Sequence, residues 1–103
     1  MTDIPPAGAA SNVVGLGVRA EARCRALSRP PYSEDPDNLT RRYLTPQHRA
    51  TIDAIAGWMR EAGMSTRLDE AGSLVGRLEG ARTGAPALVF GSHVDSVRDA
   101  GCY

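Results

Sequence analysis

The chain has 103 residues, which is enough for one modest domain and too few for a large enzyme complete in itself. Twelve arginines and no lysines balance twelve acidic residues, so the net charge is zero and the basic excess of a nucleic-acid-binding surface is absent. No stretch approaches the roughly 20 consecutive apolar residues of a membrane span. Composition therefore excludes nucleic acid and the membrane as expected partners.

The N-terminal residues 1–11 are rich in Pro, Gly and Ala, and they predict a disordered arm ahead of a folded part over 12–103. This end carries no basic segment followed by an apolar run, so it does not resemble a signal peptide. Two cysteines, Cys24 and Cys102, are too few for a disulfide scaffold. Together these features predict a cytoplasmic protein.

Two helices are expected, separated by a polar surface loop over 32–43. The first covers 12–28, where Pro30 and Pro31 end the pattern and the apolar face consists of Val14, Val18, Ala22 and Leu27. The second begins at Pro46 after the N-cap Thr45 and ends before Gly63. Its apolar stripe consists of Ile52, Ile55, Trp58, Met59 and Ala62.

After residue 63 the apolar pattern becomes that of strands. Residues 65–70 and 74–79 predict a β-hairpin whose turn is the Ala-Gly-Ser sequence at 71–73. Residues 87–90, Ala-Leu-Val-Phe, are apolar on both faces, which is typical of a central strand buried between helix layers. The predicted fold class is therefore α/β with two helices, a hairpin, a buried central strand and an incomplete sheet.

The sequence Gly-Ser-His-Val-Asp-Ser-Val at 91–97 follows this predicted strand directly. Sites in open α/β sheets form at the carboxyl ends of strands, and residues two apart in extended backbone point to the same side. His93 and Asp95 therefore form a candidate pair. An imidazole beside a carboxylate serves as a metal ligand with its orienting partner or as a base with its orienter; the alternative is a loop histidine near a surface carboxylate.

These motifs resemble the hydantoinase/carbamoylase family, which comprises allantoate amidohydrolases, N-carbamoyl-L-amino-acid hydrolases and β-ureidopropionases. The resemblance runs from about residue 23 to residue 103. Besides the run at 91–103, it rests on the helix entry at 39–50, the helix exit at 57–64 and the hairpin segment at 76–80. The Val-Arg-Asp-Ala-Gly run at 97–101 is most similar to allantoate amidohydrolases.

The resemblance implies the N-terminal portion of a zinc-peptidase-like catalytic domain with two divalent metal ions, Zn or Mn. His93 would be a metal ligand, and Asp95 would be the catalytic carboxylate that orients it. The family's bridging Asp would come directly after Tyr103. The general base, the other ligands and the lid and dimerisation domain are likewise expected beyond it, in a longer parent that forms a homodimer.

The other polar residues receive simpler interpretations. His48 is expected to pack at the start of the second helix, Cys102 and Asp99 to be loop residues, and Arg41 and Arg42 to pair locally with Glu34, Asp35 and Asp37. Ser92 and Ser96 lack a nucleophile-elbow pattern, which argues against a serine hydrolase. Tyr32 and Tyr43 are candidates to lie near a substrate cleft, although their spacing does not require it.

The expected parent activity is hydrolysis of a ureido C–N bond: allantoate would give ureidoglycine or ureidoglycolate, ammonia and carbon dioxide, a reaction of purine catabolism. The first alternative is hydrolysis of N-carbamoyl-L-amino acids by an enzyme of the same family. The second is a noncatalytic fragment that binds a partner, or nothing, through its unfinished sheet edge. For the 103-residue chain alone we expect no hydrolysis, weak metal binding and marginal solubility.

Overall fold

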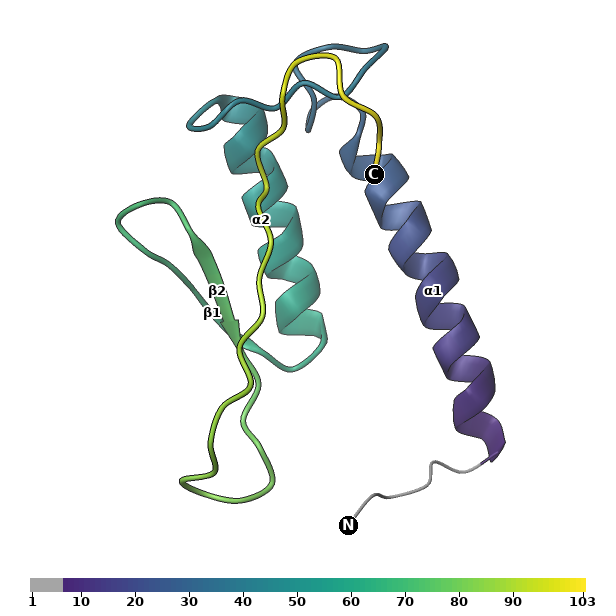
Figure 1. Ribbon diagram of the computed structural model, residues 1–103, viewed down its shortest axis with the longest axis vertical. Helices are drawn as coiled ribbons and strands as arrows, with labels where there is room; N and C mark the ends of the chain where they lie inside the picture. Colours follow the sequence, from purple (N-terminus) through teal and green to yellow (C-terminus); the bar gives the residue numbers. More distant parts are fainter. Residues whose placement is uncertain (1–6) are drawn as a thin grey trace.

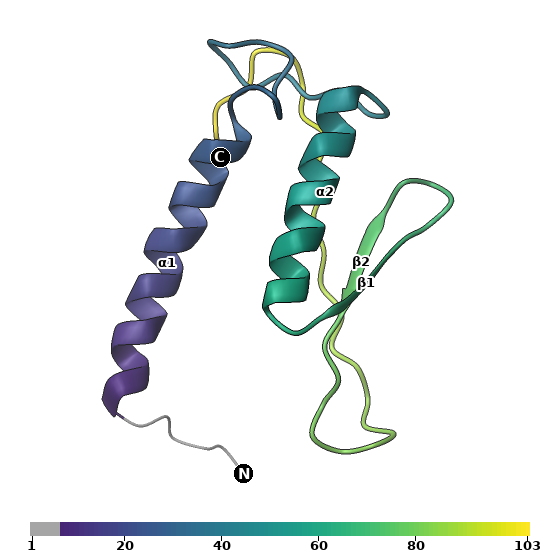
Figure 2. The same ribbon diagram turned by 180° about the vertical axis from the view of Figure 1, so that it is seen from behind.

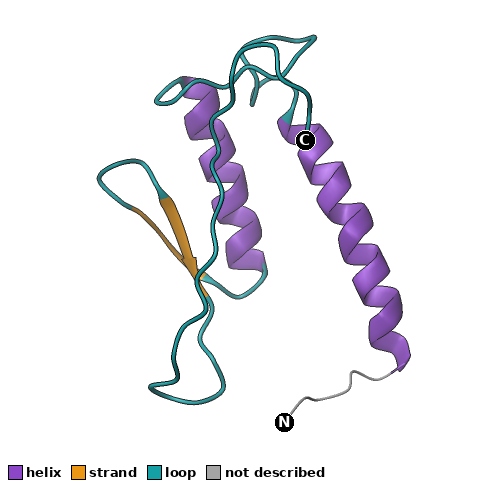
Figure 3. Cartoon of the chain, viewed as in Figure 1, coloured by secondary structure: helices purple, strands orange, loops and turns teal. Residues whose placement is uncertain are grey.

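Two helices and one hairpin make up the regular structure of residues 7–103, the part of the chain that the computed structural model describes (Figure 1). In chain order these elements are α1 (Ala7–Leu27), α2 (Pro46–Glu61), β1 (Ser65–Leu68) and β2 (Leu74–Arg77). Loops and turns form the rest, including the whole segment from β2 to the C-terminus (Figure 3). The presence of two helices and a hairpin with an incomplete sheet confirms the expected α/β class.

Helix α1 begins at Ala7, earlier than expected, so residues 7–11 of the expected arm are helical, and residues 1–6 lie outside the described part. Alanines in this stretch favour helix more than the neighbouring Pro and Gly suggested. The expected apolar face of α1 has little cover, because Val18 is 65% exposed and Ala22 is exposed too. The two helices diverge away from the ends that the 28–45 segment joins (Figures 1 and 2).

Helix α2 has the predicted signals at both ends. Thr45 is the N-cap, and its side-chain oxygen accepts the His48 N–H at 3.2 Å. At the other end Gly63 adopts a positive φ of 91°, which glycine tolerates without the steric cost of a Cβ. The Gly63 and Met64 N–H groups donate to the carbonyls of Arg60 and Met59, each at 3.0 Å, in a Schellman motif that pairs the last helical carbonyls.

The small core lies along α2. Its buried side chains are His48, Thr51, Ile52 and Ala56, of which Ile52 and Ala56 are the buried apolar residues in the described part of the chain. The predicted stripe is thus buried at Ile52, half-buried at Ile55, Trp58 and Met59, and exposed at Ala62. The buried residues of α2 thus lie between His48 and Ala56, and the final residues of the helix are exposed.

The hairpin is antiparallel and in the register that its turn dictates. Ser65 pairs with Arg77 and Leu68 with Leu74, so the two strands are shorter than the predicted 65–70 and 74–79. The Asp69 carboxylate accepts the N–H groups of Ala71 and Ser73 at 2.9 and 2.8 Å. This local bonding ends the ladder at Leu68, because residues 69–73 form the turn instead of extending the strands.

The expected buried central strand at 87–90 is wrong for this chain. Residues 87–90 have no strand structure, and Leu88, Val89 and Phe90 are 86%, 85% and 87% exposed. A strand of this kind requires neighbouring strands on both sides and helices on both faces. Among residues 7–103, β1 and β2 pair only with each other, and neither strand pairs with this segment.

The described residues form an open arrangement. Their principal extents are 46 × 33 × 19 Å and their radius of gyration is 16.1 Å, against about 13 Å for a compact domain of this length. No helix among residues 7–103 is long and apolar enough to cross a membrane. Both cysteines are free thiols, as expected.

Candidate metal-ligand pair

His93 and Asp95 contact each other, although through a bend at Val94 and not, as their spacing predicted, from the same side of extended backbone. His93 Nδ1 lies 2.8 Å from the backbone carbonyl of Asp95 and 3.2 Å from its Oδ1. Both of these oxygens are acceptors, so Nδ1 must carry the proton in the neutral imidazole. The lone pair of that tautomer is therefore on Nε2, the nitrogen that faces away from Asp95.

This arrangement has the chemistry of a metal ligand with its orienting partner. Ligating histidines commonly donate their second ring N–H to a carboxylate or a backbone carbonyl, which fixes the tautomer and raises the basicity of the ligating nitrogen. The side chains of His93 and Asp95 are 81% and 51% exposed, so an ion or substrate has access to the pair. The same geometry also fits a general base with its orienter.

Hydrogen bonds to residues 39–41 hold the segment that carries the pair. Leu39 and Ala100 exchange backbone hydrogen bonds of 3.0 and 2.8 Å, and the Ser96 N–H donates to the Arg41 carbonyl at 2.8 Å. The Arg41 N–H in turn donates to Ser96 Oγ at 3.0 Å. The segment 94–100 therefore has a defined position although it contains no strand.

Arg41 is the functional-region residue that the sequence interpretation missed. We expected it to pair with nearby carboxylates, but its side chain is buried and donates to three carbonyls: Nε to Val94 at 2.8 Å, and Nη1 to Leu27 and Tyr32 at 2.7 and 3.2 Å. Burial lowers the pKa of Arg41, and the nearby Asp95 carboxylate acts in the opposite direction. The sequence gives little indication of these partners, because arginine can bond to carbonyls at many helix ends and loops.

The loop over 32–43 is more ordered than a surface loop. The Ser33 hydroxyl is buried and accepts the N–H groups of Thr40 and Asp35 at 3.1 and 3.2 Å. Its proton is donated to the carbonyl of Asp35 at 2.7 Å or to that of Asn38 at 3.0 Å. Ser33 thus closes the turn that presents residues 39–41 to the 94–100 segment.

The remaining candidates do not join the pair. His48 is buried at the start of α2, as expected, with its ring 5.4 Å from that of Tyr43 in an edge-to-face contact. Tyr43 donates its hydroxyl proton to the Ala71 carbonyl in the hairpin turn, so it is occupied away from the pair. Across residues 7–103 no three His, Cys, Asp or Glu side chains come close enough to hold a metal ion, and this includes Asp99 and Cys102.

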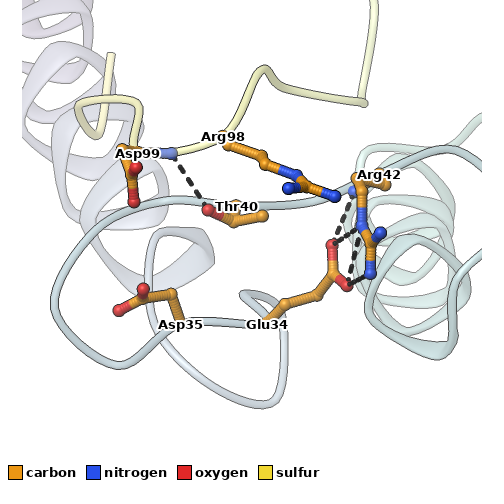
Figure 4. Close-up of a pocket in the computed structure, with 6 residues that line it drawn as sticks. All are labelled: Glu34, Asp35, Thr40, Arg42, Arg98 and Asp99. Carbon is orange, nitrogen blue, oxygen red and sulfur yellow. Dashed lines mark hydrogen bonds and ion pairs between the residues drawn. The ribbon is translucent and has the colours of Figure 1, made fainter.

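A separate hollow of about 250 Å³ lies where the 32–43 loop meets the 98–99 turn (Figure 4). Its lining is Glu34, Asp35, Thr40, Arg42, Arg98 and Asp99. Figure 4 shows Glu34 facing Arg42, whose Nη2 lies 2.6 Å from Glu34 Oε1, so this part of the expected local charge pairing is confirmed. The opposite charges within the hollow largely neutralise each other, and it is not a clear anion or cation site.

Comparison with known proteins gives several similar sequences. Allantoate deiminase 1 from Glycine max is 40% identical over 86 residues, or 84% of this chain. An N-carbamoyl-L-amino-acid amidohydrolase from Paenarthrobacter aurescens is 39% identical over 85 residues, or 82% of the chain. An N-carbamoyl-L-amino acid amidohydrolase from Geobacillus stearothermophilus is 43% identical over 65 residues, or 63% of the chain.

The aligned region is a small part of each relative. It covers 18%, 20% and 16% of these three proteins, so the chain spans about a fifth or less of their length. No family model matches the chain, and no solved structure matches it. The likeness is therefore one of sequence, and it covers most of the chain but little of each relative.

Proposed function

We propose that this chain, which belongs to the family of allantoate deiminases and N-carbamoyl-L-amino-acid amidohydrolases, forms the N-terminal part of a longer metal-dependent amidohydrolase. The longer protein would hydrolyse a ureido or carbamoyl C–N bond. The proposed fold is a zinc-peptidase-like catalytic domain, in a cytoplasmic homodimer. The short coverage of each relative and the incomplete sheet both support a longer parent.

The observation that carries the proposal is the contact between His93 and Asp95. Both oxygens of Asp95 that face Nδ1 are acceptors, which leaves the Nε2 lone pair available in an exposed position. A histidine that binds metal needs a lone pair on one ring nitrogen, and a hydrogen bond from the other nitrogen fixes which one; a loop histidine without a partner would exchange between tautomers. The pair therefore has the donor set of a metal ligand with its orienting carboxylate.

The described residues supply one ligand of the proposed site. Catalytic zinc sites use three protein ligands or more, and no such group exists among residues 7–103. We therefore assign the other ligands of the two proposed divalent ions, Zn or Mn, to the rest of the longer protein. When bound, such ions polarise the scissile carbonyl and lower the pKa of a water molecule. The role of His93 and Asp95 is to supply and orient one ligating nitrogen.

Allantoate is the first proposed substrate, because the 97–101 segment is most similar to allantoate amidohydrolases and because several similar proteins carry the name allantoate deiminase. N-carbamoyl-L-amino acids are the second candidate. Two bacterial proteins with that activity in their names are 39% and 43% identical to the chain, as similar as the plant proteins. The two substrates share the ureido carbon that the reaction attacks.

The test is an assay of ammonia release by the longer protein, with allantoate and with N-carbamoyl-L-amino acids, in the presence of manganese. The proposal expects metal-dependent ammonia release from allantoate and less from the N-carbamoyl compounds. The reverse preference supports the second candidate. No metal-dependent hydrolysis of either substrate contradicts the proposal and favours a noncatalytic fragment.

The isolated chain gives a complementary prediction. With one ligand it should bind zinc only weakly and should hydrolyse neither substrate. Isothermal titration of the 103-residue chain with zinc measures this directly. One tight site per chain would contradict the assignment of the other ligands to residues outside it.

A further inference from the structure

Arg41 connects three segments through one side chain. Its guanidinium donates to the carbonyl of Leu27 at the C-terminal end of α1, to that of Tyr32 in the following loop and to that of Val94 beside the His93–Asp95 pair. The side chain is buried, with the whole residue 7% exposed. A buried arginine that pairs with carbonyls is costly unless the bonds are well formed, so this placement favours a specific role.

The backbone of Arg41 holds the other side of Asp95. Its N–H donates to Ser96 Oγ at 3.0 Å and its carbonyl accepts the Ser96 N–H at 2.8 Å. Arg41 therefore bonds to Val94 through its side chain and to Ser96 through its backbone. These are the two residues that flank Asp95, so Arg41 fixes the turn from both sides.

The turn determines where the acceptors of Asp95 lie. His93 Nδ1 contacts both the Asp95 carbonyl and its carboxylate, and the backbone bends at Val94 between the two residues. Without the bond from Arg41 to the Val94 carbonyl, no other hydrogen bond in the described part of the chain holds that peptide group. The acceptors of Asp95 would then no longer be held in one position relative to the Nδ1–H group of His93.

We propose that Arg41 is a positioning residue that sets the tautomer and orientation of His93 by holding the 94–96 turn. It acts through Val94 and Ser96 and does not touch the reacting atoms. This inference rests on the proposed function for the role of the His93–Asp95 pair, because a metal site uses an Nε2 nitrogen held in one direction. Its physical content, the control of the 94–96 turn, is a property of this chain alone.

The adjacent Arg42 offers a matched control. It has the same chemistry one position along, but its side chain is more than half exposed and pairs with Glu34 at 2.6 Å, away from the 94–96 turn. Arg41→Ala removes the bonds to three carbonyls, whereas Arg42→Ala removes a surface ion pair. Both variants remove one positive charge, so a difference between them reports the loss of the three carbonyl bonds and not the loss of charge.

The experiment is NMR of the 103-residue chain with ¹⁵N-labelled histidine and backbone, without metal, at a pH where the imidazole is neutral. The ring ¹⁵N shifts report the His93 tautomer, and amide exchange reports the Ser96 N–H. In the wild type we expect the Nδ1–H tautomer and slowed Ser96 exchange. Arg41→Ala should give a tautomer mixture and faster Ser96 exchange by about tenfold or more. Arg42→Ala should leave both signals unchanged.

The Ala100 N–H, which donates to the Leu39 carbonyl at 2.8 Å, reports whether the surrounding fold survives. If Arg41→Ala also exposes this amide, Arg41→Lys decides the outcome, because a lysine keeps the charge but lacks the separate Nε and Nη1 donors of the guanidinium. A tautomer mixture in Arg41→Lys with Ala100 still protected supports the proposal. A wild-type tautomer in whichever Arg41 variant keeps its fold overturns it. Since no metal or substrate is used, the result is independent of whether the longer protein is an amidohydrolase.

Discussion

Arg41 and Arg42 are adjacent in the chain but lie in different electrostatic environments. Arg41 is buried among carbonyls, whereas Arg42 forms a two-pronged pair with Glu34 through Nε at 3.1 Å and Nη2 at 2.6 Å. Hydrogen bonds from the Arg42 side chain, together with its backbone N–H, hold the pKa of Glu34 at about 2 instead of 4.5. Two neighbouring arginines thus have different partners: Arg41 bonds to buried carbonyls and Arg42 pairs with the Glu34 carboxylate.

The Glu34 pair gives a pH-dependent prediction. A carboxyl whose pKa is lowered by folding stabilises the fold above its unfolded-state pKa, and this contribution is lost as the pH falls from 4.5 through about 2. We expect the Glu34 carboxyl ¹³C resonance to titrate near 2 and Arg42→Ala to return it toward 4.5. Arg49→Ala, which breaks the separate Arg49–Asp53 pair, is the control and should change nothing at Glu34. Titration of Glu34 near 4.5 in the wild type would contradict the contact.

The candidate pair could be predicted from sequence, but its support could not. The two-residue spacing of His93 and Asp95 places their side chains close enough for contact, so the pairing itself can be expected from local sequence. The contacts of Arg41 span 53 residues to Val94 and depend on how two loops meet. Spacing along the chain contains no information of that kind, and the neighbouring acidic residues favoured the wrong partner.

At the scale of elements, α2 and β2 meet through a glycine. A Cβ built on Gly76 would lie 2.6 Å from the sulfur of Met59 and 3.0 Å from that of Met64, so the strand approaches the helix closely only because this position has no side chain. The thioethers are flexible and could move partly aside. The contact between hairpin and helix is thus sensitive to one methyl group.

This contact predicts the effect of Gly76→Ala. We expect a loss of about 1 kcal/mol in the free energy of unfolding, at the low end of overpacking effects because methionine can adjust. Urea denaturation followed by circular dichroism measures it. Gly57→Ala is the matched control: no atom outside the helix backbone lies within 4 Å of its Cβ position, so alanine should stabilise α2 by roughly 0.5–1 kcal/mol. Equal effects of the two substitutions would contradict the close approach of β2 to α2.

The elements differ in how far sequence could predict them. The boundaries of α2 follow from local chemistry, since Thr45, Pro46 and Gly63 act within one turn of the helix ends. The hairpin likewise follows from its turn. The strand prediction for residues 87–90 was wrong because a strand is defined by its partners. The apolar composition of the segment does not show whether those partners are present.

At the scale of the whole molecule, the exposed apolar segment 87–90 accompanies an open shape. Leu88, Val89 and Phe90 are almost fully exposed, and backbone of this kind with unpaired donors and acceptors tends to pair with other chains. The described residues bury few apolar side chains along α2. Both features fit a unit that requires further protein to cover its surface, as the proposed longer parent would supply.

The exposed segment predicts concentration-dependent association of the isolated chain. We expect sedimentation velocity to show species larger than the monomer as concentration rises, and we expect Val89→Lys to reduce them because a charged residue opposes edge pairing. Val18→Lys replaces a 65% exposed valine on α1 and serves as the control. A strictly monomeric wild-type chain with a sharp cooperative melt would contradict this account.

Whether His93 is a metal ligand of an amidohydrolase can be measured with His93→Ala in the longer protein, with Ser92→Ala as the neighbouring control. The measurement is bound metal per chain together with metal-dependent ammonia release from allantoate and N-carbamoyl-L-amino acids. We predict that His93→Ala loses bound metal and nearly all hydrolysis, while Ser92→Ala retains both. Full metal content and unchanged hydrolysis in His93→Ala would contradict it.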